Sequence, residues 1–228
     1  MKTLVIDIGG TNIKIYATGR KEAVKTPSGP TLTPKQMVKV VREATAEWTY
    51  SVVSIGYPGP VVHGKPLRDP ANLGSGWVGF DFKKAFGCPV RIINDAAMQA
   101  LGSYRGGRML FLGLGTGLGS AFVVDGVLEP MELAHLPYKH GRSFEEYVGV
   151  AALKRMGEKK WIKTVYDVVA QLKNALQADY VVLGGGNAKR LTVLPPGTFA
   201  GENSNASQGG FRLWHTETQL KKLAAAGD

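Results

Sequence analysis

The chain contains a single cysteine, Cys88, among its 228 residues, so no disulfide can form within it. A lone cysteine just ahead of a proline is typical of a packed thiol, and we place the protein in the reducing cytoplasm. No apolar run reaches the length that crosses a bilayer, which leads us to expect no membrane partner. The first apolar stretch begins at residue 3, so we also expect no signal peptide.

Acidic residues are scarce beside basic ones: 18 Asp and Glu stand against 28 Lys and Arg, and the net charge is +10. Residues 1–114 hold 15 basic and 7 acidic side chains, whereas residues 115–228 hold 13 and 11. Such an excess attracts polyanions. The basic residues are scattered, however, and the sequence lacks helix-turn-helix, zinc-ligand and RNA-binding aromatic patterns. We therefore expect no nucleic-acid partner, and a merely solvated basic surface remains an alternative.

Apolar strands and helical segments alternate along the chain, which predicts an α/β fold with sheets covered on both faces. Thr33-Pro34 favours the start of a helix, because threonine caps the first turn and proline fits within it. We predict strands at about 3–8, 12–18, 51–57, 90–93 and 180–183, a hairpin at 109–127, helices at 33–45, from 96, near 143–156, 161–178 and 216–226, and loops at 63–80 and 195–210.

Three glycine-rich stretches follow apolar strands. The first is Asp7-Ile8-Gly9-Gly10-Thr11-Asn12, the second is Gly113–Gly119 with Thr116 at its tip, and the third is Gly184–Gly186, ahead of an expected helix. Glycine lets backbone N–H groups approach a phosphate, and a carboxylate at a strand end, such as Asp7, is placed to hold hydrated Mg²⁺. None of the three is followed by the Gly-Lys-Ser/Thr of a Walker loop. An ordinary hairpin remains the alternative for the first stretch.

Several polar residues are candidates for chemistry. Asp95 follows a buried strand and starts a helix, so it either takes the proton of a substrate hydroxyl or simply caps the helix. Glu132 and His135 lie three residues apart and would share one face of a helical turn. Such a pair either grips adjacent sugar hydroxyls from a buried position or makes a structural contact. Glu145 is a further candidate, and Glu146 competes with it for that role.

With these residues in view, the chain resembles the ROK family of sugar kinases and, within it, the polyphosphate glucokinase branch. The resemblance runs from Leu4 to about Lys189. It rests on an ordered set of motifs: Asp-Ile-Gly-Gly-Thr at 7–11, Gly-Tyr-Pro-Gly-Pro-Val at 56–61, Ala-Asn-Leu at 71–73, Ile-Asn-Asp-Ala at 93–96, Leu-Gly-Thr-Gly-Leu-Gly-Ser-Ala at 114–121, the segment 125–135, Gly-Arg-Ser-Phe-Glu at 141–145 and Val-Leu-Gly-Gly-Gly at 182–186.

The resemblance implies a two-lobed, actin-like (ribonuclease H-like) ATPase and sugar kinase fold with an interlobe cleft. We expect an N-terminal lobe at 1–97 and a C-terminal lobe at 98–213, with the helix 214–228 packing back on the first lobe. Family members are often dimers, so a homodimer is expected. The family's cysteine-rich zinc motif is missing, and we expect no structural zinc. Ala134 replaces the usual Gly between Glu and His, and 202–207 only loosely matches the family's closing loop.

The same resemblance assigns roles to individual residues. Asp95 matches the general base, and Asp7 would bind Mg²⁺ through water. The sugar-binding positions correspond to Asn72, Asn94, Asp95, Glu132, His135 and Glu145, and the phosphate- and nucleotide-binding positions to Asp7, Gly9, Gly10, Thr11, Asn12, Lys14, Thr116, Gly117, Gly184, Gly185 and Gly186.

The activity implied is that of a kinase that moves a phosphoryl group from inorganic polyphosphate, ATP or both to the 6-hydroxyl of glucose or a close hexose. Two alternatives stay open. One is a non-catalytic ROK-like sugar sensor or regulator, and the other is an amino-sugar kinase that uses ATP only.

Overall fold

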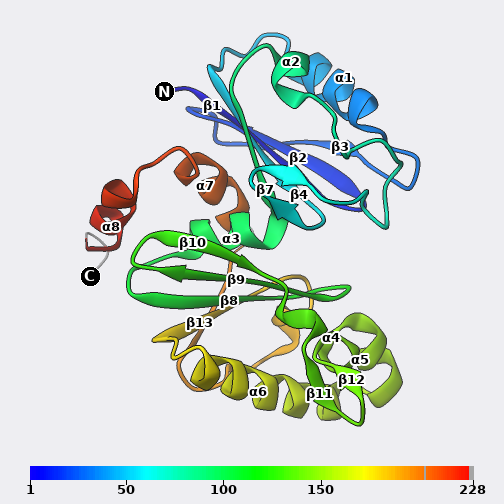
Figure 1. Cartoon of the computed structure of the whole chain (residues 1–228), viewed down its shortest axis with the longest axis vertical. Helices are drawn as coiled ribbons and strands as arrows, with labels where there is room; N and C mark the ends of the chain where they lie inside the picture. Colours follow the sequence, from blue (N-terminus) through cyan, green and yellow to red (C-terminus); the bar gives the residue numbers. More distant parts are fainter. Residues whose placement is uncertain (203, 226–228) are drawn as a thin grey trace. The chain divides into compact units, whose positions relative to one another are not determined.

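The computed structural model describes residues 1–202 and 204–225, which fall into two compact units (Figure 1). The chain passes from one unit to the other after Met98, Asn205 and Trp214. The first unit comprises Met1–Met98 and Ala206–Trp214, and the second comprises Gln99–Asn205 and His215–Asp228. Within the described part of the chain, each unit is built on a five-stranded sheet.

The lobes that the sequence suggests, 1–97 and 98–213, stay a prediction. The same holds for the packing of the helix 214–228 on the first lobe, and its residues 226–228 lie outside the described residues.

The sheet of the first unit is centred on β1, in which every residue is buried. Its strand order is β3-β2-β1-β4-β7, with β2 antiparallel and β4 parallel to β1. The isoleucines and leucine of alternate positions in β1 and β2 pack with α1 and α2 into one core. The elements are β1 (Thr3–Ile8), β2 (Asn12–Ala17), β3 (Val24–Pro27), α1 (Pro34–Ala44), β4 (Val52–Tyr57), β5 (Val61–Val62), β6 (Lys65–Pro66), α2 (Phe82–Phe86) and β7 (Val90–Asn94).

Helix α1 begins as the sequence predicts. The Thr33 side chain accepts a hydrogen bond from the Gln36 N–H at 3.3 Å, and the Gln36 side chain accepts one from the Thr33 N–H at 2.8 Å. Two N–H groups that would otherwise lack partners are thereby satisfied. The sequence did not predict α2, which Asp81 caps by accepting from the Lys84 N–H.

The segment 195–210 is not the loop that the sequence predicts, since it contains β14 (Thr198–Ala200) and most of α7 (Asn205–Arg212). Glycine lowers helix propensity, so the two glycines of α7, Gly209 and Gly210, argue against a helix when the sequence is considered alone. In the structure, the lack of a side chain at Gly210 allows α7 to pack closely on Val5, because any side chain there would collide with Val5. Ser54 fixes the contact by donating from Oγ to the Gly210 carbonyl at 2.6 Å.

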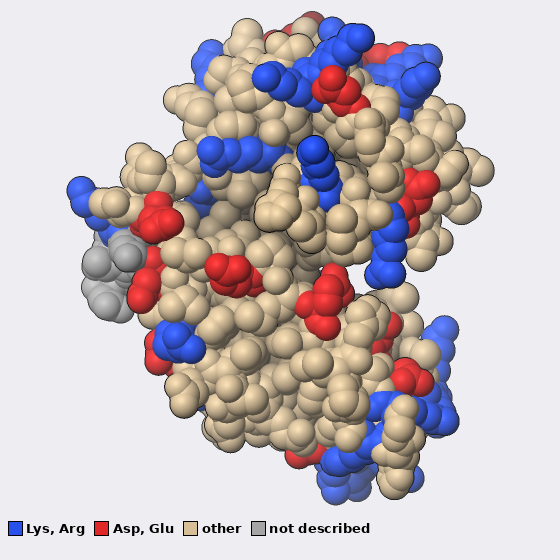
Figure 2. All heavy atoms as spheres, viewed as in Figure 1, with Lys and Arg blue, Asp and Glu red and all other residues tan. Residues whose placement is uncertain are grey.

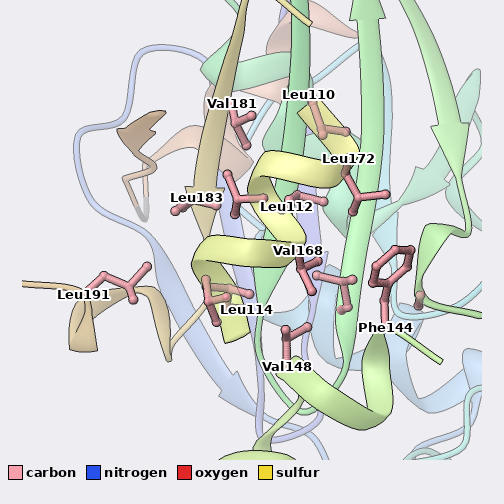
Figure 3. Packing of buried hydrophobic residues seen from close by; sticks show 14 of the residues in the cluster. Leu110, Leu112, Leu114, Phe144, Val148, Val168, Leu172, Val181, Leu183 and Leu191 are labelled. Atoms are coloured by element: carbon pink, nitrogen blue, oxygen red, sulfur yellow. The ribbon is translucent and has the colours of Figure 1, made fainter. Parts of the chain in front are cut away.

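The sheet of the second unit has the order β10-β9-β8-β13-β14 and packs on α6 (Figure 3). Leu110, Leu112 and Leu114 alternate along β8 and face Val168 and Leu172 of the helix. The elements are α3 (Asp95–Ser103), which begins in the first unit, β8 (Arg108–Leu114), β9 (Leu118–Val124), β10 (Val127–Met131), η1 (Leu133–His135), β11 (Pro137–Lys139), β12 (Arg142–Ser143), α4 (Glu145–Val148), α5 (Val150–Met156), α6 (Glu158–Ala175), β13 (Tyr180–Gly184), η2 (Ala188–Arg190) and α8 (Glu217–Ala225).

The third glycine stretch is followed by the short 3-10 turn η2 and not by the helix that the sequence predicts. Gly185 adopts a φ of +82°, and a side chain there would collide with the backbone of Leu114. The chain therefore turns at a position that only glycine accepts, and the turn prevents a helix from starting. In residues 1–202 and 204–225, every helix lacks the length and apolar character that a membrane span requires.

Candidate active site

The first glycine loop joins β1 to β2 in a tight hairpin. The Gly9 N–H donates to the Asn12 carbonyl at 3.0 Å, and the Ser28 hydroxyl donates to the Gly9 carbonyl at 2.6 Å. Gly10 and Thr11 remain exposed at the tip. The loop therefore holds its shape through its own backbone and through Ser28, a residue that sequence analysis did not single out.

Asp7 forms an ion pair with Lys14, the residue directly opposite it on β2, with Lys14 Nζ 3.4 Å from Asp7 Oδ2. Burial raises the pKa of Asp7 above its ordinary value, and the charge of Lys14 acts in the opposite direction. The Asp7 charge and burial together raise the pKa of Tyr16 on the same strand as Lys14, with burial the larger cause. The end of β1 thus carries a carboxylate whose charge is compensated by one ammonium group.

Asn72 lies against the first glycine loop, because a side chain at Gly10 would collide with its amide nitrogen. The loop that carries Asn72 is held by Asp69, whose carboxylate accepts from the N–H groups of Gly76 and Trp77 at 3.1 and 2.8 Å. These backbone hydrogen bonds lower the pKa of Asp69 below its ordinary value. Asp69 is a second residue that sequence analysis missed, and Asp-Pro in a loop was its only local signal.

Asn94 ends β7 and caps α3. Its side-chain oxygen accepts from the N–H groups of Ala96 and Ala97 at 2.8 and 3.2 Å, while its side-chain nitrogen donates to the Gly59 carbonyl at 3.0 Å. Asp95 Oδ1 accepts from the Ala96 N–H at 2.8 Å. The capping role that the sequence left open for Asp95 is therefore filled largely by Asn94, and the part-buried Asp95 begins the helix. The expected contacts of both residues with sugar stay predictions.

The second glycine loop is held by the residues that begin α4 and α5. Glu145 Oε2 accepts from the Leu118 N–H at 3.2 Å, and a side chain at Gly117 would collide with this carboxylate. The Val150 N–H donates to the Thr116 carbonyl at 3.1 Å. Glu146, in contrast, is exposed and accepts from the Ser143 N–H at 2.8 Å. The structure thus distinguishes the two glutamates, since Glu145 contacts the loop and Glu146 binds the backbone of Ser143 just ahead of its own helix.

Glu132 and His135 lie beside each other on η1, with His135 Nε2 3.8 Å from Glu132 Oε2. Ser120 fixes this turn by accepting from the Leu133 N–H at 3.1 Å. The two side chains are 53% and 61% exposed, so the expectation that they form a buried pair is wrong. The turn sits at the surface because Ala134 between them points into the core, leaving its neighbours outward.

The third glycine stretch borders a cavity of about 300 Å³ within the second unit. Gly184 is packed against Phe111, where no side chain would fit, and Gln99 lies close by. Asn187 ties this stretch to the second glycine loop by donating from Nδ2 to the Gly115 carbonyl at 3.0 Å. The cavity is lined by Gln99, Leu183, Gly184, Gly185, Ala188, Lys189, Leu191, Thr192, Leu194, Ala200, Gly201 and Glu202. Sequence analysis found its glycines but missed Gln99 and Glu202, which come from distant segments.

A sequence model of the ROK family matches residues 3–129, more than half of the chain. The protein belongs to the ROK family. The chain is 29% identical over 208 residues to a polyphosphate glucokinase of Mycobacterium tuberculosis, and the match covers 81% of this chain and 77% of the relative. The fold class predicted from the sequence, the α/β fold of actin-like ATPases and sugar kinases, is confirmed.

Two solved structures illustrate this similarity. The inorganic polyphosphate/ATP-glucomannokinase of Arthrobacter sp. strain KM has a TM-score of 0.77 at 25% identity, covering 96% of this chain and 98% of that one. A ROK family glucokinase of Streptomyces griseus, in complex with glucose and AMPPNP, has a TM-score of 0.69 at 18% identity, covering 93% and 99%. At that lower identity the likeness concerns the fold alone.

Proposed function

We propose that the protein is a sugar kinase that transfers a phosphoryl group from inorganic polyphosphate or ATP to the 6-hydroxyl of glucose or a close hexose. One observation carries the proposal: in each unit, a residue expected to bind sugar contacts a glycine loop expected to bind phosphate. Asn72 lies against Gly10 in the first unit, and Glu145 lies against Gly117 in the second. Phosphoryl transfer depends mainly on positioning and charge stabilisation, so this proximity is what the reaction needs.

The general base in this proposal is Asp95. It takes the proton of the 6-hydroxyl while the hydroxyl oxygen attacks the terminal phosphorus, and a shortened polyphosphate or ADP leaves. Asn94 supports this role by holding the first turn of α3, on which Asp95 lies. Within the second unit, Glu132 accepts and His135 donates hydrogen bonds to adjacent hydroxyls.

The surroundings of Asp7 fit a magnesium ion that is bound mainly by the phosphates of the donor. In the described residues, no three His, Cys, Asp or Glu side chains gather as a metal site would need. Mg²⁺ commonly binds one or two carboxylates together with waters and substrate phosphates, so Asp7 alone is sufficient. When bound, the ion would neutralise charge on the transferred phosphoryl group. Lys14 and the N–H groups near Gly9, Gly10, Thr11 and Asn12 hold the phosphate in this proposal.

Both donors have support. The names of the relatives, polyphosphate glucokinase and polyphosphate/ATP-glucomannokinase, favour polyphosphate. The cavity beside Gly184–Gly186 favours ATP as a second donor, since it has the size of a small-molecule site and has apolar and polar lining residues. Thr116 and Gly117 then hold the phosphates in either case.

A coupled assay decides between this proposal and its alternatives. Formation of the corresponding sugar 6-phosphate is measured with Mg²⁺ and either long-chain polyphosphate or ATP, for glucose, mannose and N-acetylmannosamine. We expect turnover of glucose with both donors and a higher kcat/KM with polyphosphate. If calorimetry shows glucose binding but no sugar is turned over, the protein would be a sugar sensor. Turnover of N-acetylmannosamine with ATP, but not with polyphosphate, would support the amino-sugar kinase. Sedimentation velocity on the same sample tests the expected homodimer.

A further inference from the structure

The second unit carries a basic surface around α5 and the first turns of α6. Figure 2 shows blue side chains gathered over the region that α5, β11 and β12 occupy in Figure 1. We call this surface the α5–α6 basic patch. It consists of Arg142 of β12, Lys154 and Arg155 of α5, and Lys159, Lys160 and Lys163 of α6.

The patch carries charge that other side chains do not neutralise. Residues 142–163 hold six basic and three acidic side chains. None of the six basic residues forms an ion pair with a residue that the structure describes. Of the three acids, Glu145 contacts Leu118 and Glu158 pairs with Arg190 at 2.7 Å. Glu146 alone faces the patch; the hydrogen bond from the Ser143 N–H is the main cause that lowers its pKa, and the charges of Arg142 and Arg155 act in the same direction.

Two lysines of the patch repel each other along helix α6. Lys159 and Lys163 lie four residues apart, on the side of α6 opposite the buried Trp161 and Val165. Like charges at this spacing destabilise a helix. The hydroxyl of Thr164 contacts Met156 Sδ at 3.8 Å, which brings the end of α5 and its basic residues against the same turn. A bound polyanion would relieve this repulsion.

The patch continues from the second glycine loop. Helix α5 starts where the Val150 N–H meets the Thr116 carbonyl, and it ends with Lys154 and Arg155 in its last turn. Seven helical residues span about 10 Å, so the basic side chains begin a short distance from the loop. We propose that the patch binds the distal part of a long polyphosphate chain whose end lies at the second glycine loop. This inference rests on the proposed function.

The proposal commits to polyphosphate and not to nucleic acid. The patch offers exposed lysines and arginines. Of the aromatic side chains in residues 142–163, Phe144 and Trp161 are buried and Tyr147 packs edge-on against Tyr138. Single-stranded nucleic acid is usually bound through bases stacked on aromatic side chains as well as through phosphates. Polyphosphate has no bases and carries a charge on every phosphate. A surface that supplies charge alone therefore suits it better.

The test compares two variants with equal loss of charge. In the patch variant, Lys154, Lys159, Lys160 and Lys163 are replaced by Gln; in the control, Lys21, Lys35, Lys65 and Lys83 of the first unit are replaced by Gln. All eight side chains belong to exposed residues, so both proteins should fold. We measure the Kd of fluorescent long-chain polyphosphate at several salt concentrations, and the KM for long-chain polyphosphate, for tetrapolyphosphate and for ATP.

We expect the patch variant to bind long-chain polyphosphate roughly tenfold more weakly than wild type at moderate salt, with a salt dependence reduced by roughly 0.7 per lysine. Its KM for tetrapolyphosphate and ATP should stay within twofold of wild type. An unchanged Kd, an equal loss in the control variant, or tighter binding of a single-stranded RNA of equal charge would each overturn the proposal. Because the Kd does not require turnover, an inactive protein would refute the proposed kinase activity while the binding result still decides the role of the patch.

Discussion

Glu145 accepts a hydrogen bond from the Leu118 N–H at 3.2 Å, and the same carboxylate fills the space beside Gly117. The second glycine loop and a residue expected to bind sugar therefore share one contact. A displacement of either partner must affect the other. In the proposed kinase, this contact links the position of the donor phosphate to that of the sugar.

The first prediction concerns Gly117→Ala. The added methyl group collides with the Glu145 carboxylate, so the loop or the carboxylate must move. Since a displacement of about 1 Å at a reacting centre reduces turnover roughly a hundredfold, we expect a loss of kcat of that order. Gly115→Ala is the matched control, since no atom lies within 4 Å of a side chain added at that position of the same loop. Steady-state kinetics on both variants tests this, and equal activities would show that the contact has no role in turnover.

Sequence analysis located the parts of the molecule that depend on local pattern. The Thr33-Pro34 start of α1 and the hairpin at the first glycine loop follow from residues close together in the sequence. Asp95 was placed at a strand end because an apolar run stops just before it. Such signals require no knowledge of distant contacts.

Other features depend on distant contacts and were missed for that reason. Helix α7 contains two adjacent glycines that oppose a helix locally, and it is stabilised by Val5 and Ser54, more than 150 residues away. The contact of Glu145 with Leu118 and the approach of Asn72 to Gly10 likewise join segments that are separate in sequence. The exposure of Glu132 and His135 was also missed, since it follows from Ala134 between them being the residue that packs into the core.

The second prediction separates the two polar functions of Asn94. Asn94→Ala removes the acceptor for the Ala96 and Ala97 N–H groups and should lower the free energy of unfolding by about 1 kcal/mol, as loss of a helix cap does. Asn94→Asp keeps the acceptor and should retain most of that stability. Both lose the bond to Gly59, which fixes the residue next to Asp95, so both should show reduced kcat. Urea unfolding and kinetics measure the two effects, and an Ala variant as stable as wild type would contradict the capping role.

The third prediction is that Asp95→Asn lowers kcat by roughly two orders of magnitude or more, the effect of losing a general base. Asparagine still offers an oxygen to the Ala96 N–H, so the fold and the glucose Kd should change little. Asp81→Asn is the control, because it too places asparagine at a helix start where an N–H is accepted. Calorimetry gives the glucose Kd, and the coupled assay gives kcat. Wild-type turnover in the Asp95 variant would remove the proposed mechanism.

The last prediction concerns pH and Asp7. Burial raises its pKa above 3.8, so the folded protein binds this proton more tightly than the unfolded chain does. Well below pH 3.8 the residue is protonated in both states. As the pH rises from 3.8 to the raised pKa, the unfolded chain ionises first, and the free energy of unfolding falls.

The measurement is the free energy of urea unfolding of wild type minus that of Asp7→Asn, from pH 3 to pH 8, because the other carboxylates cancel in the difference. We expect this difference to decrease as the pH rises. Asp69 supplies the opposite case, since backbone N–H groups lower its pKa. The free energy of unfolding of wild type minus that of Asp69→Asn should therefore decrease as the pH falls below 3.8 and increase as the pH rises. A flat or increasing curve for Asp7 would mean that the bond to Lys14 outweighs the effect of burial.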